Sequence, residues 1–285
     1  MTNKRVAFCT LGCKVNQYET NAMMQEFMKH EWEIVDFEEV ANAYIINTCT
    51  VTNMADRKSR QMIRRVKEIN PEAILVAVGC YAQVAKEELE KIPEIDLILG
   101  TNEKKNIYNL VNELVQDRNL IGKEEKNQKI DITDVLHCEE YAEFGEVTFT
   151  EKTRAVIKVQ DGCDRFCSYC IIPFARGHIR SRKPENVISE VTKIAKIGIK
   201  EVVITGIHLA SYGRDFNEEN IKYGLIDLLE EINKIEGIQR IRLRFTRANI
   251  NNERICSKII KIRKSMPSFS FIATKWLQWN FKENE

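Results

Sequence analysis

Short apolar runs alternate with amphipathic stretches in the N-terminal third of the sequence. Three runs have the length and composition of buried strands: KRVAFCT (4–10), AYIINTC (43–49) and AILVAVGC (73–80). Residues 20–30 and 56–70 have apolar positions near helical spacing, and Pro71 ends the second stretch. Because strands and helices alternate, we predict an α/β domain with a parallel sheet over residues 1–100.

The same alternation returns near the middle of the chain, after a polar stretch. Residues 101–150 lose periodicity, so we interpret them as a linker with some local structure. The pattern then predicts strands at 153–160, 200–206 and 238–244, with helices at 184–198 and 221–237. This repetition is of the (β/α) barrel type. The predicted fold class is therefore α/β, with an incomplete (β/α) partial barrel over residues 151–243 after the N-terminal parallel-sheet domain.

The composition limits the possible classes of protein. With 285 residues, of which 44% are hydrophobic, the chain is long enough for two domains with separate cores. The formal net charge is +1, so any surface for a nucleic acid must be local. No apolar run reaches the roughly 18 residues of a membrane span, and the N-terminus enters a strand without a signal-peptide core. We therefore expect a soluble cytoplasmic protein that does not bind membranes.

Cysteines follow each of the three apolar runs of the N-terminal domain. The sequence has nine cysteines, and in a reducing compartment such clusters more often serve metal or redox chemistry than disulfides. Cys13, Cys49 and Cys80 lie just after predicted strands, and the carboxyl ends of parallel strands meet at one edge of a sheet. We therefore predict that these three thiolates converge on a metal, rather than packing as small hydrophobes. Cys9 lies inside its strand and is predicted to belong to the core, with a backup thiol for this site as the alternative.

A second group of cysteines follows the predicted strand 153–160. In DGCDRFCSYCIIPFARG, the residues Cys163, Cys167 and Cys170 have the spacing C-x3-C-x2-C. A structural zinc site would use four ligands. Three thiolates can instead hold three irons of a 4Fe-4S cluster and leave the fourth iron open, as a catalytic site requires. From the spacing alone, zinc or an electron-transfer cluster remain alternatives. Cys138, beside His137 in the polar stretch, is interpreted as incidental.

The C-x3-C-x2-C motif, with Tyr169 before its last cysteine, resembles the signature of radical S-adenosylmethionine enzymes. In that family the open iron binds the amino and carboxylate groups of S-adenosyl-L-methionine, and an electron from the cluster cleaves the sulfonium to give a 5′-deoxyadenosyl radical. Further segments resemble the methylthiotransferases of this superfamily over residues 4 to about 243: TLGCKVNQYET, NTCTVT, GCYAQ, RAVIKVQDGCDRFCSYCIIPFARGHIRSR and EVVITGIHLASYG.

This resemblance implies two 4Fe-4S clusters and S-adenosyl-L-methionine as cofactors. Cys13, Cys49 and Cys80 match the ligands of the family's N-terminal cluster, which would supply sulfur, and a second S-adenosyl-L-methionine would supply the methyl group. Cys163, Cys167 and Cys170 match the ligands of the radical-forming cluster. Tyr169 resembles the aromatic residue beside the cofactor and Gly206 the glycine that the cofactor approaches closely; ordinary packing or turn geometry is the alternative for both. No catalytic residue beyond the cluster ligands is expected.

The segments KVNQYET and CIIPFARG most resemble the branch of the family that acts on tRNA at N6-threonylcarbamoyladenosine 37 (t6A37) and inserts a methylthio group at C2. Close relatives act on isopentenyladenosine in tRNA or on an aspartate of a ribosomal protein. The implied partners are tRNA that reads ANN codons and an electron donor such as flavodoxin or ferredoxin. Arg176, Arg180 and Arg182 in ARGHIRSR are candidates for phosphate contact, with a solvated basic loop as the alternative.

The resemblance stops after Arg242. The family continues with segments such as GSLEP and CPHFHLSLQSG, whereas this chain has RFTRANINN and MPSFSFIATKWLQWNFKENE. GSLEP written as GGT TCA CTA GAG CCA and read from the third base gives Phe-Thr-Arg-Ala, which matches Phe245 to Ala248. We therefore interpret residues 244–285 as a frameshifted, poorly ordered tail in which Cys256 has no role. The chain would then lack the later strands and the RNA-binding TRAM domain of the family, so an inactive, truncated iron–sulfur fragment is the alternative function.

Overall fold

The computed structural model describes residues 4–50, 52–121, 128–150, 153–216, 223–244 and 265–268. These residues form two compact units. The first unit comprises Met1–Cys138, Ala142–Phe149 and Asp164–His178, and the second comprises Glu139–Tyr141, Thr150–Cys163 and Ile179–Glu285. The cysteine-rich segment after residue 163 thus belongs to the first unit, although the sequence pattern assigned it to the second predicted domain.

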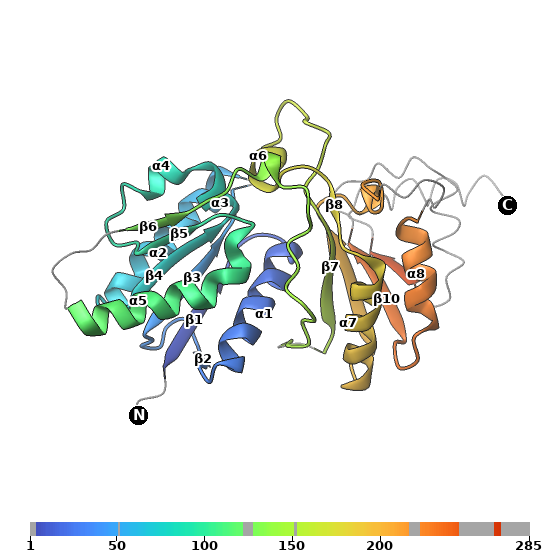
Figure 1. The fold of residues 1–285 in the computed structure, drawn as a ribbon, viewed down its shortest axis with the longest axis horizontal. Coiled ribbons are helices and arrows are strands. Elements are labelled where there is room, and N and C mark those ends of the chain that lie inside the picture. The colour runs from blue at the N-terminus through green and yellow to red at the C-terminus, as the bar shows by residue number, and fades with distance from the viewer. Residues whose placement is uncertain are drawn as a thin grey trace. The chain divides into compact units, whose positions relative to one another are not determined.

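A parallel sheet with the strand order β2-β1-β3-β4-β5-β6 forms the centre of the first unit (Figure 1). Its strands are β1 (Arg5–Thr10), β2 (Glu33–Val35), β3 (Ala43–Thr48), β4 (Ile74–Gly79), β5 (Leu97–Leu99) and β6 (Lys129–Asp131). Every residue of β3 and β4 is buried. Such continuous burial is typical of a parallel sheet that is covered on both faces, and it explains why the predicted strands show apolar runs without alternation.

Helices cover both faces of this sheet. The helical elements of the first unit are α1 (Lys14–Lys29), α2 (Asn53–Ile69), α3 (Cys80–Val84), α4 (Lys86–Leu89), η1 (Glu103–Asn106), α5 (Ile107–Ile121), η2 (Val135–His137) and α6 (Ile172–Arg176). Phe27 of α1 packs in one core cluster with Ile45 of β3, whereas Ile63 of α2 packs in another with Ile46 of β3. Consecutive strand residues therefore point into two cores on opposite faces.

The second unit contains a sheet with the order β11-β10-β9-β7-β8, in which only β8 runs antiparallel to its neighbour. Its elements are β7 (Ala155–Asp161), β8 (Arg180–Ser181), α7 (Pro184–Lys196), β9 (Glu201–Gly206), η3 (Leu209–Ser211), α8 (Leu225–Lys234), β10 (Arg240–Arg244) and β11 (Ser265–Ser268). One face is covered by α7 and α8, whose Val191 and Leu228 pack in one core with Ile157 and Ile204 of the strands. The predicted order of strands and helices over 153–244 is confirmed.

Two predicted stretches differ in detail from the structure. Residues 101–150, interpreted as a linker, contain α5 and β6, and β6 extends the first sheet. Within residues 244–285, β11 pairs with β10 so that Ser265 lies opposite Ile241. Residues 245–264 and 269–285, including Cys256, lie outside the described residues, so the frameshift stays a prediction. Among the helices that the structure describes, none is long and apolar enough to cross a membrane.

Candidate functional site

Three cysteines lie at the carboxyl ends of neighbouring strands in the first unit. Cys13 precedes α1 at the end of β1, Cys49 follows β3, and Cys80 begins α3 directly after β4. Cys49 and Cys80 are buried and Cys13 is half-buried. The placement at one edge of the sheet is as predicted from the sequence, whereas the role of the three residues as ligands stays a prediction.

Glycines allow the chain to turn sharply before two of these cysteines. Gly12 and Gly79 have φ angles of +97° and +107°, in the region that favours glycine. A Cβ atom on Gly12 would lie 2.6 Å from Sγ of Cys49, and one on Gly79 would lie 2.8 Å from the carbonyl oxygen of Thr48. The sequences LGC and VGC therefore bring the backbone before Cys13 and Cys80 close to the end of β3.

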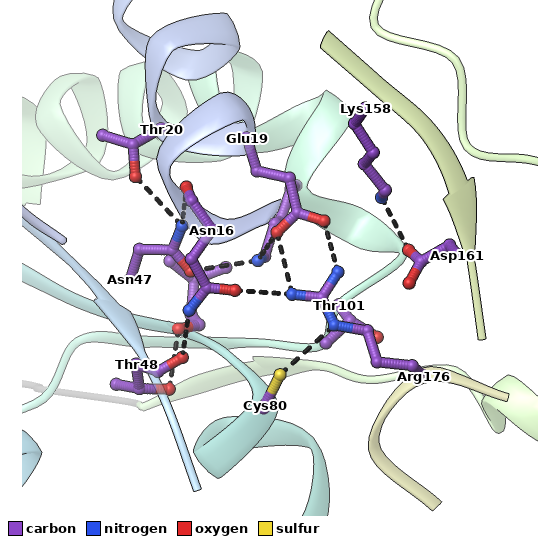
Figure 2. A network of polar contacts seen from close by, with 12 residues as sticks. Asn16, Glu19, Thr20, Asn47, Thr48, Cys80, Thr101, Lys158, Asp161 and Arg176 are labelled. Carbon is purple, nitrogen blue, oxygen red and sulfur yellow. Dashed lines mark hydrogen bonds and ion pairs between the residues drawn. The ribbon is translucent and has the colours of Figure 1, made fainter. Parts of the chain in front are cut away.

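A buried polar network surrounds this edge of the sheet (Figure 2). Asn16 of α1 donates its side-chain amide to the carbonyls of Leu11, at 2.7 Å, and Thr48, at 2.9 Å. Asn47 of β3 donates to the carbonyl of Asn16 and to the hydroxyl of Thr20, both at 3.0 Å. These hydrogen bonds fix the beginning of α1, and with it Cys13, against the ends of β1 and β3.

Two buried cations belong to the same network. Lys104 forms an ion pair with Glu19 and donates to Oδ1 of Asn47 at 3.0 Å. Arg176 of α6 also pairs with Glu19, donates to Oδ1 of Asn16 at 2.5 Å, and places its Nε 3.2 Å from Sγ of Cys80. Glu19, Lys104 and Arg176 each have 0% of their surface exposed. The thiol of Cys80 therefore lies beside two buried positive charges.

The electrostatics at Cys80 combine burial with positive charge. Burial raises the pKa of the Cys80 thiol, and the charges of Arg176 and Lys104 act against this rise. Burial also lowers the pKa of Lys104, and the Glu19 carboxylate acts against that change. A thiolate, or an anionic cluster bound to it, would be stabilised by these cations.

The donor chemistry of this edge fits a cluster held by three thiolates. Three cysteines suffice for a 4Fe-4S cluster with one open iron, and N–H donors close to ligand sulfurs are usual around such clusters. In the described part of the chain, no group of three or more His, Cys, Asp and Glu side chains could hold a metal ion as it stands. Ligation by Cys13, Cys49 and Cys80 stays a prediction.

The second cysteine motif is divided between the two units. Cys163 follows β7 in the second unit, whereas Cys167 and Cys170 lie in the Asp164–His178 segment of the first. The amide of Cys170 donates to the carbonyl of Cys167 at 2.8 Å, which closes a tight turn around Tyr169. Tyr169 is 79% exposed. Its predicted role at the cofactor is untested.

Gln160, which was not predicted to be a site residue, joins the residues that follow β7 and β9 in the second unit by hydrogen bonds. Its amide donates to the carbonyls of Asp161 and Gly162, at 2.6 and 2.8 Å, and its oxygen accepts from the amide of His208 at 2.7 Å. A Cβ atom on Gly206 would lie 3.0 Å from Cβ of Gln160, so this side chain leaves little room for a larger residue at position 206. The signal available in the sequence was a glutamine near the end of a largely apolar strand. The cofactor role of Gly206 stays a prediction.

The arginines of ARGHIRSR do not form a phosphate-binding loop, and neither that prediction nor the solvated alternative is correct. Arg176, Arg180 and Arg182 are at most 2% exposed. Arg182 forms a fully buried ion pair with Glu190, at 2.7 Å. The sequence shows a local excess of positive charge, but the acidic partners Glu19 and Glu190 come from other elements.

The remaining cysteines that the structure describes have local surroundings. Cys9 packs against the core beside α2, and burial raises the pKa of its thiol to about 11, which confirms its predicted place in the core. Sγ of Cys138 lies 3.6 Å from the carbonyl of Asp134, and Nδ1 of His137 lies 2.9 Å from the carboxylate of the same residue. These contacts agree with the interpretation of Cys138 as incidental.

Comparison with known families gives two matches. Residues 5–100 match the uncharacterized protein family UPF0004, and residues 157–272 match the radical SAM superfamily. The second match continues beyond Arg242, where the resemblance was expected to stop. Among solved structures, the radical S-adenosylmethionine methyltransferase TsrM from Kitasatospora setae, with tryptophan and the analogue aza-SAM bound, has a TM-score of 0.54 at 14% identity. The match covers 85% of this chain and 54% of TsrM, and this likeness shows the fold alone.

Curated relatives are closer in sequence. The threonylcarbamoyladenosine tRNA methylthiotransferase MtaB of Bacillus subtilis is 40% identical over 90% of this chain and 54% of its own length. MtaB of Aquifex aeolicus is 40% identical over 93% of this chain and 62% of its own length. The ribosomal protein uS12 methylthiotransferase RimO of Clostridium botulinum is 34% identical over 85% of this chain and 52% of its own length.

A UPF0004 domain followed by a radical SAM domain, with these relatives, shows that the chain belongs to the radical SAM methylthiotransferases, a family of enzymes. Within that family it is of the MtaB type. The chain spans between half and two thirds of the length of the two MtaB relatives, 54% and 62%.

Proposed function

We propose that the chain provides the two cluster-binding sites of an enzyme that inserts a methylthio group at C2 of t6A37 in tRNA. The observation that carries this proposal is the presence of two three-cysteine sets in one chain of the MtaB type. One set follows the strands of the UPF0004 domain, and the other begins after β7 in the radical SAM domain. The 40% identity to MtaB of Bacillus subtilis supports the choice of t6A as the substrate.

Each cysteine set has its own task in this proposal. Cys163, Cys167 and Cys170 would hold a 4Fe-4S cluster, and with S-adenosyl-L-methionine bound this site would supply the radical chemistry needed at C2 of the adenine. Cys13, Cys49 and Cys80 hold a second cluster, at the edge of the sheet that Figure 2 shows in part. This second site would supply the sulfur atom of each product, and a second S-adenosyl-L-methionine would supply the methyl group and leave as S-adenosylhomocysteine.

Other residues of the chain bind and orient the reactants. The exposed ring of Tyr169 and the backbone at Gly206 contact the S-adenosyl-L-methionine in this proposal. An electron donor such as flavodoxin or ferredoxin reduces the radical-forming cluster, and the macromolecular partner is tRNA that reads ANN codons. The reaction takes place in the cytoplasm.

A second candidate substrate is favoured by one of the relatives. The tRNA-2-methylthio-N(6)-dimethylallyladenosine synthase of Bacillus licheniformis is 35% identical over 82% of this chain, which favours isopentenyladenosine. The other alternative is an iron–sulfur protein without turnover, and the same assay separates it from both substrates.

Anaerobic reconstitution with iron and sulfide tests these functions. We expect about eight irons per chain, and a loss of about four when either set of three cysteines is replaced by alanine. Cys138→Ala is the matched control and should retain all the iron, because its sulfur lies beside the carbonyl of Asp134 in its own segment and Cys138 belongs to neither set.

The loaded chain is then incubated with S-adenosyl-L-methionine, a reductant and tRNA that contains either t6A or isopentenyladenosine. Mass analysis of the nucleosides should detect 2-methylthio-t6A. Modification of isopentenyladenosine alone would replace the proposed substrate by the second candidate. A full complement of iron without modification of either tRNA would identify the chain as an iron–sulfur fragment without turnover.

A further inference from the structure

Arg176 is held in the first unit by contacts of its own short helix. The carbonyl of Ala175 in α6 accepts a hydrogen bond from the hydroxyl of Thr101 at 3.0 Å. A Cβ atom on Gly177, whose φ is +73°, would lie 2.1 Å from the carbonyl oxygen of Val135. The backbone on both sides of Arg176 therefore packs tightly against the first unit, which limits how far its side chain can move.

The guanidinium group of Arg176 uses several donors at once, as Figure 2 shows. Its Nε points to Sγ of Cys80 at 3.2 Å, and Nη2 donates to Oδ1 of Asn16 at 2.5 Å and to Oε2 of Glu19 at 3.1 Å. Nη1 donates to the other oxygen of Glu19. Because the guanidinium is planar, the pairing of Nη1 and Nη2 with Glu19 and Asn16 fixes the direction in which Nε points. A lysine could supply the charge but not this set of directions.

We propose that Arg176 is a positioning residue for Cys80 in the N-terminal cluster and donates its Nε hydrogen to the sulfur of that ligand. The inference rests on the proposed role of Cys80 as a cluster ligand. Arg176 belongs to the same segment as Cys167 and Cys170, which are proposed to hold the other cluster. One segment therefore supplies two ligands to the radical-forming cluster and orients a ligand of the N-terminal cluster.

Such a hydrogen bond has a measurable effect on the cluster. An N–H donor and a positive charge beside a ligand sulfur stabilise the reduced form of the cluster, which carries one more negative charge, and so raise its reduction potential. A residue that only paired with Glu19 to stabilise the fold would leave the potential unchanged. The potential therefore separates the positioning role from a purely structural one.

The test uses the full chain with Cys163, Cys167 and Cys170 replaced by alanine, so that only the N-terminal set can bind a cluster. In this background Arg176→Lys and Arg176→Gln are compared with the unchanged arginine by redox titration followed by electron paramagnetic resonance. We expect a lower potential in Arg176→Lys, a still lower one in Arg176→Gln, and faster loss of iron to a chelator in both.

Arg182→Lys is the matched control, since Arg182 is also a fully buried arginine in an ion pair but belongs to the second unit. It should change thermal stability without changing the potential. If Arg176→Gln does not fold, Arg176→Lys decides the question. An unchanged potential and unchanged iron retention in Arg176→Lys would overturn the inference and leave the proposed function intact. Absence of iron from the N-terminal set with Arg176 in place would overturn both.

Discussion

Asn16 donates its side-chain amide to the backbone carbonyl of Thr48, across 2.9 Å, and to the carbonyl of Leu11 as well. One side chain of α1 thus joins the ends of β1 and β3, the two strands that precede Cys13 and Cys49. The relative position of these two cysteines therefore depends on the hydrogen bonds of a single polar side chain.

Replacement of Asn16 by alanine should destabilise the chain. Two backbone carbonyls lose a donor inside the protein, and we expect a loss of about 1–3 kcal/mol in the free energy of unfolding. Denaturant unfolding measures the change. Gln61→Ala on the exposed face of α2 is the control and should change the stability by less than about 0.5 kcal/mol. Equal stabilities of the two variants would contradict the role of Asn16.

Replacement of Gly79 by alanine should cost more than the same change at Gly198. Both glycines have positive φ angles, +107° and +91°. A Cβ atom on Gly79 would lie 2.7 Å from Oδ1 of Asn47, whereas a Cβ atom on Gly198 has nothing within 4 Å. The extra cost at Gly79 should be about 1–3 kcal/mol, because the end of β3 must move.

Thermal or denaturant unfolding of Gly79→Ala and Gly198→Ala gives this difference. Gly79→Ala should also bind less iron at the N-terminal set, since Cys80 is the next residue. A variant at Gly79 that is no less stable than the one at Gly198 would show that the end of β3 accommodates the added atom.

Replacement of Glu19 by glutamine should be among the most destabilising single changes. Glu19 pairs with Lys104 and with Arg176, and all three residues are fully buried. Loss of its charge leaves two cations close together in the interior, so we expect a loss of about 3–5 kcal/mol. Denaturant unfolding of Glu19→Gln and of the unchanged chain measures this loss.

Glu38→Gln provides the comparison for Glu19, because Glu38 pairs with Arg65 at 2.8 Å on the exposed face of α2. This change should cost between about 0 and 1 kcal/mol. A double variant with Glu19→Gln and Lys104→Met should recover part of the loss, since it removes one of the two remaining cations. Failure of the second change to recover any stability would argue against the electrostatic explanation.

Stability at alkaline pH should depend on Cys9. Burial raises the pKa of its thiol to about 11 in the folded chain, from an ordinary value of 9.0. A raised pKa favours the neutral thiol, so this contribution to stability is complete below pH 9 and is lost as the pH rises towards 11. Between pH 9 and 11, the free energy of unfolding of Cys9→Ala should therefore fall by about 1–2 kcal/mol less than that of the unchanged chain.

Unfolding measured at several pH values for both chains tests this dependence, and the difference between them removes the contributions of lysines and tyrosines that titrate in the same range. Parallel curves for the two chains between pH 9 and 11 would show that the thiol of Cys9 ionises as easily in the folded state as in the unfolded state.

Much of the fold follows from local pattern. The apolar runs at 4–10, 43–49 and 73–80 correspond to β1, β3 and β4. Strands that are buried on both faces can be recognised in the sequence because they are continuous apolar runs. The three-residue strands β2, β5 and β6 were not predicted, since so few residues do not show a pattern that distinguishes a strand from a loop. The helix α5 could have been found, because Ile107, Val111 and Leu114 follow helical spacing.

The candidate site was only partly predictable. The positions of Cys13, Cys49 and Cys80 followed from strand order, which the sequence shows locally. The burial of Arg176 did not, because its partner Glu19 lies 157 positions away and nothing in ARGHIRSR distinguishes a buried arginine from a solvated one. Long-range ion pairs leave no periodic signal, and they decide whether a basic segment contacts a substrate or the interior of the protein.

The assignment of Asp164–His178 to the first unit affects how such proteins can be recombined. A gene boundary placed after residue 150, between the two regions of sequence similarity, would encode the sheet of the first unit without Arg176. Glu19 and Lys104 would remain in the interior with a cavity beside Cys80. Exchange of the N-terminal module between members of the family therefore has to be accompanied by α6, so the two regions must be inherited together even though they are separate in sequence.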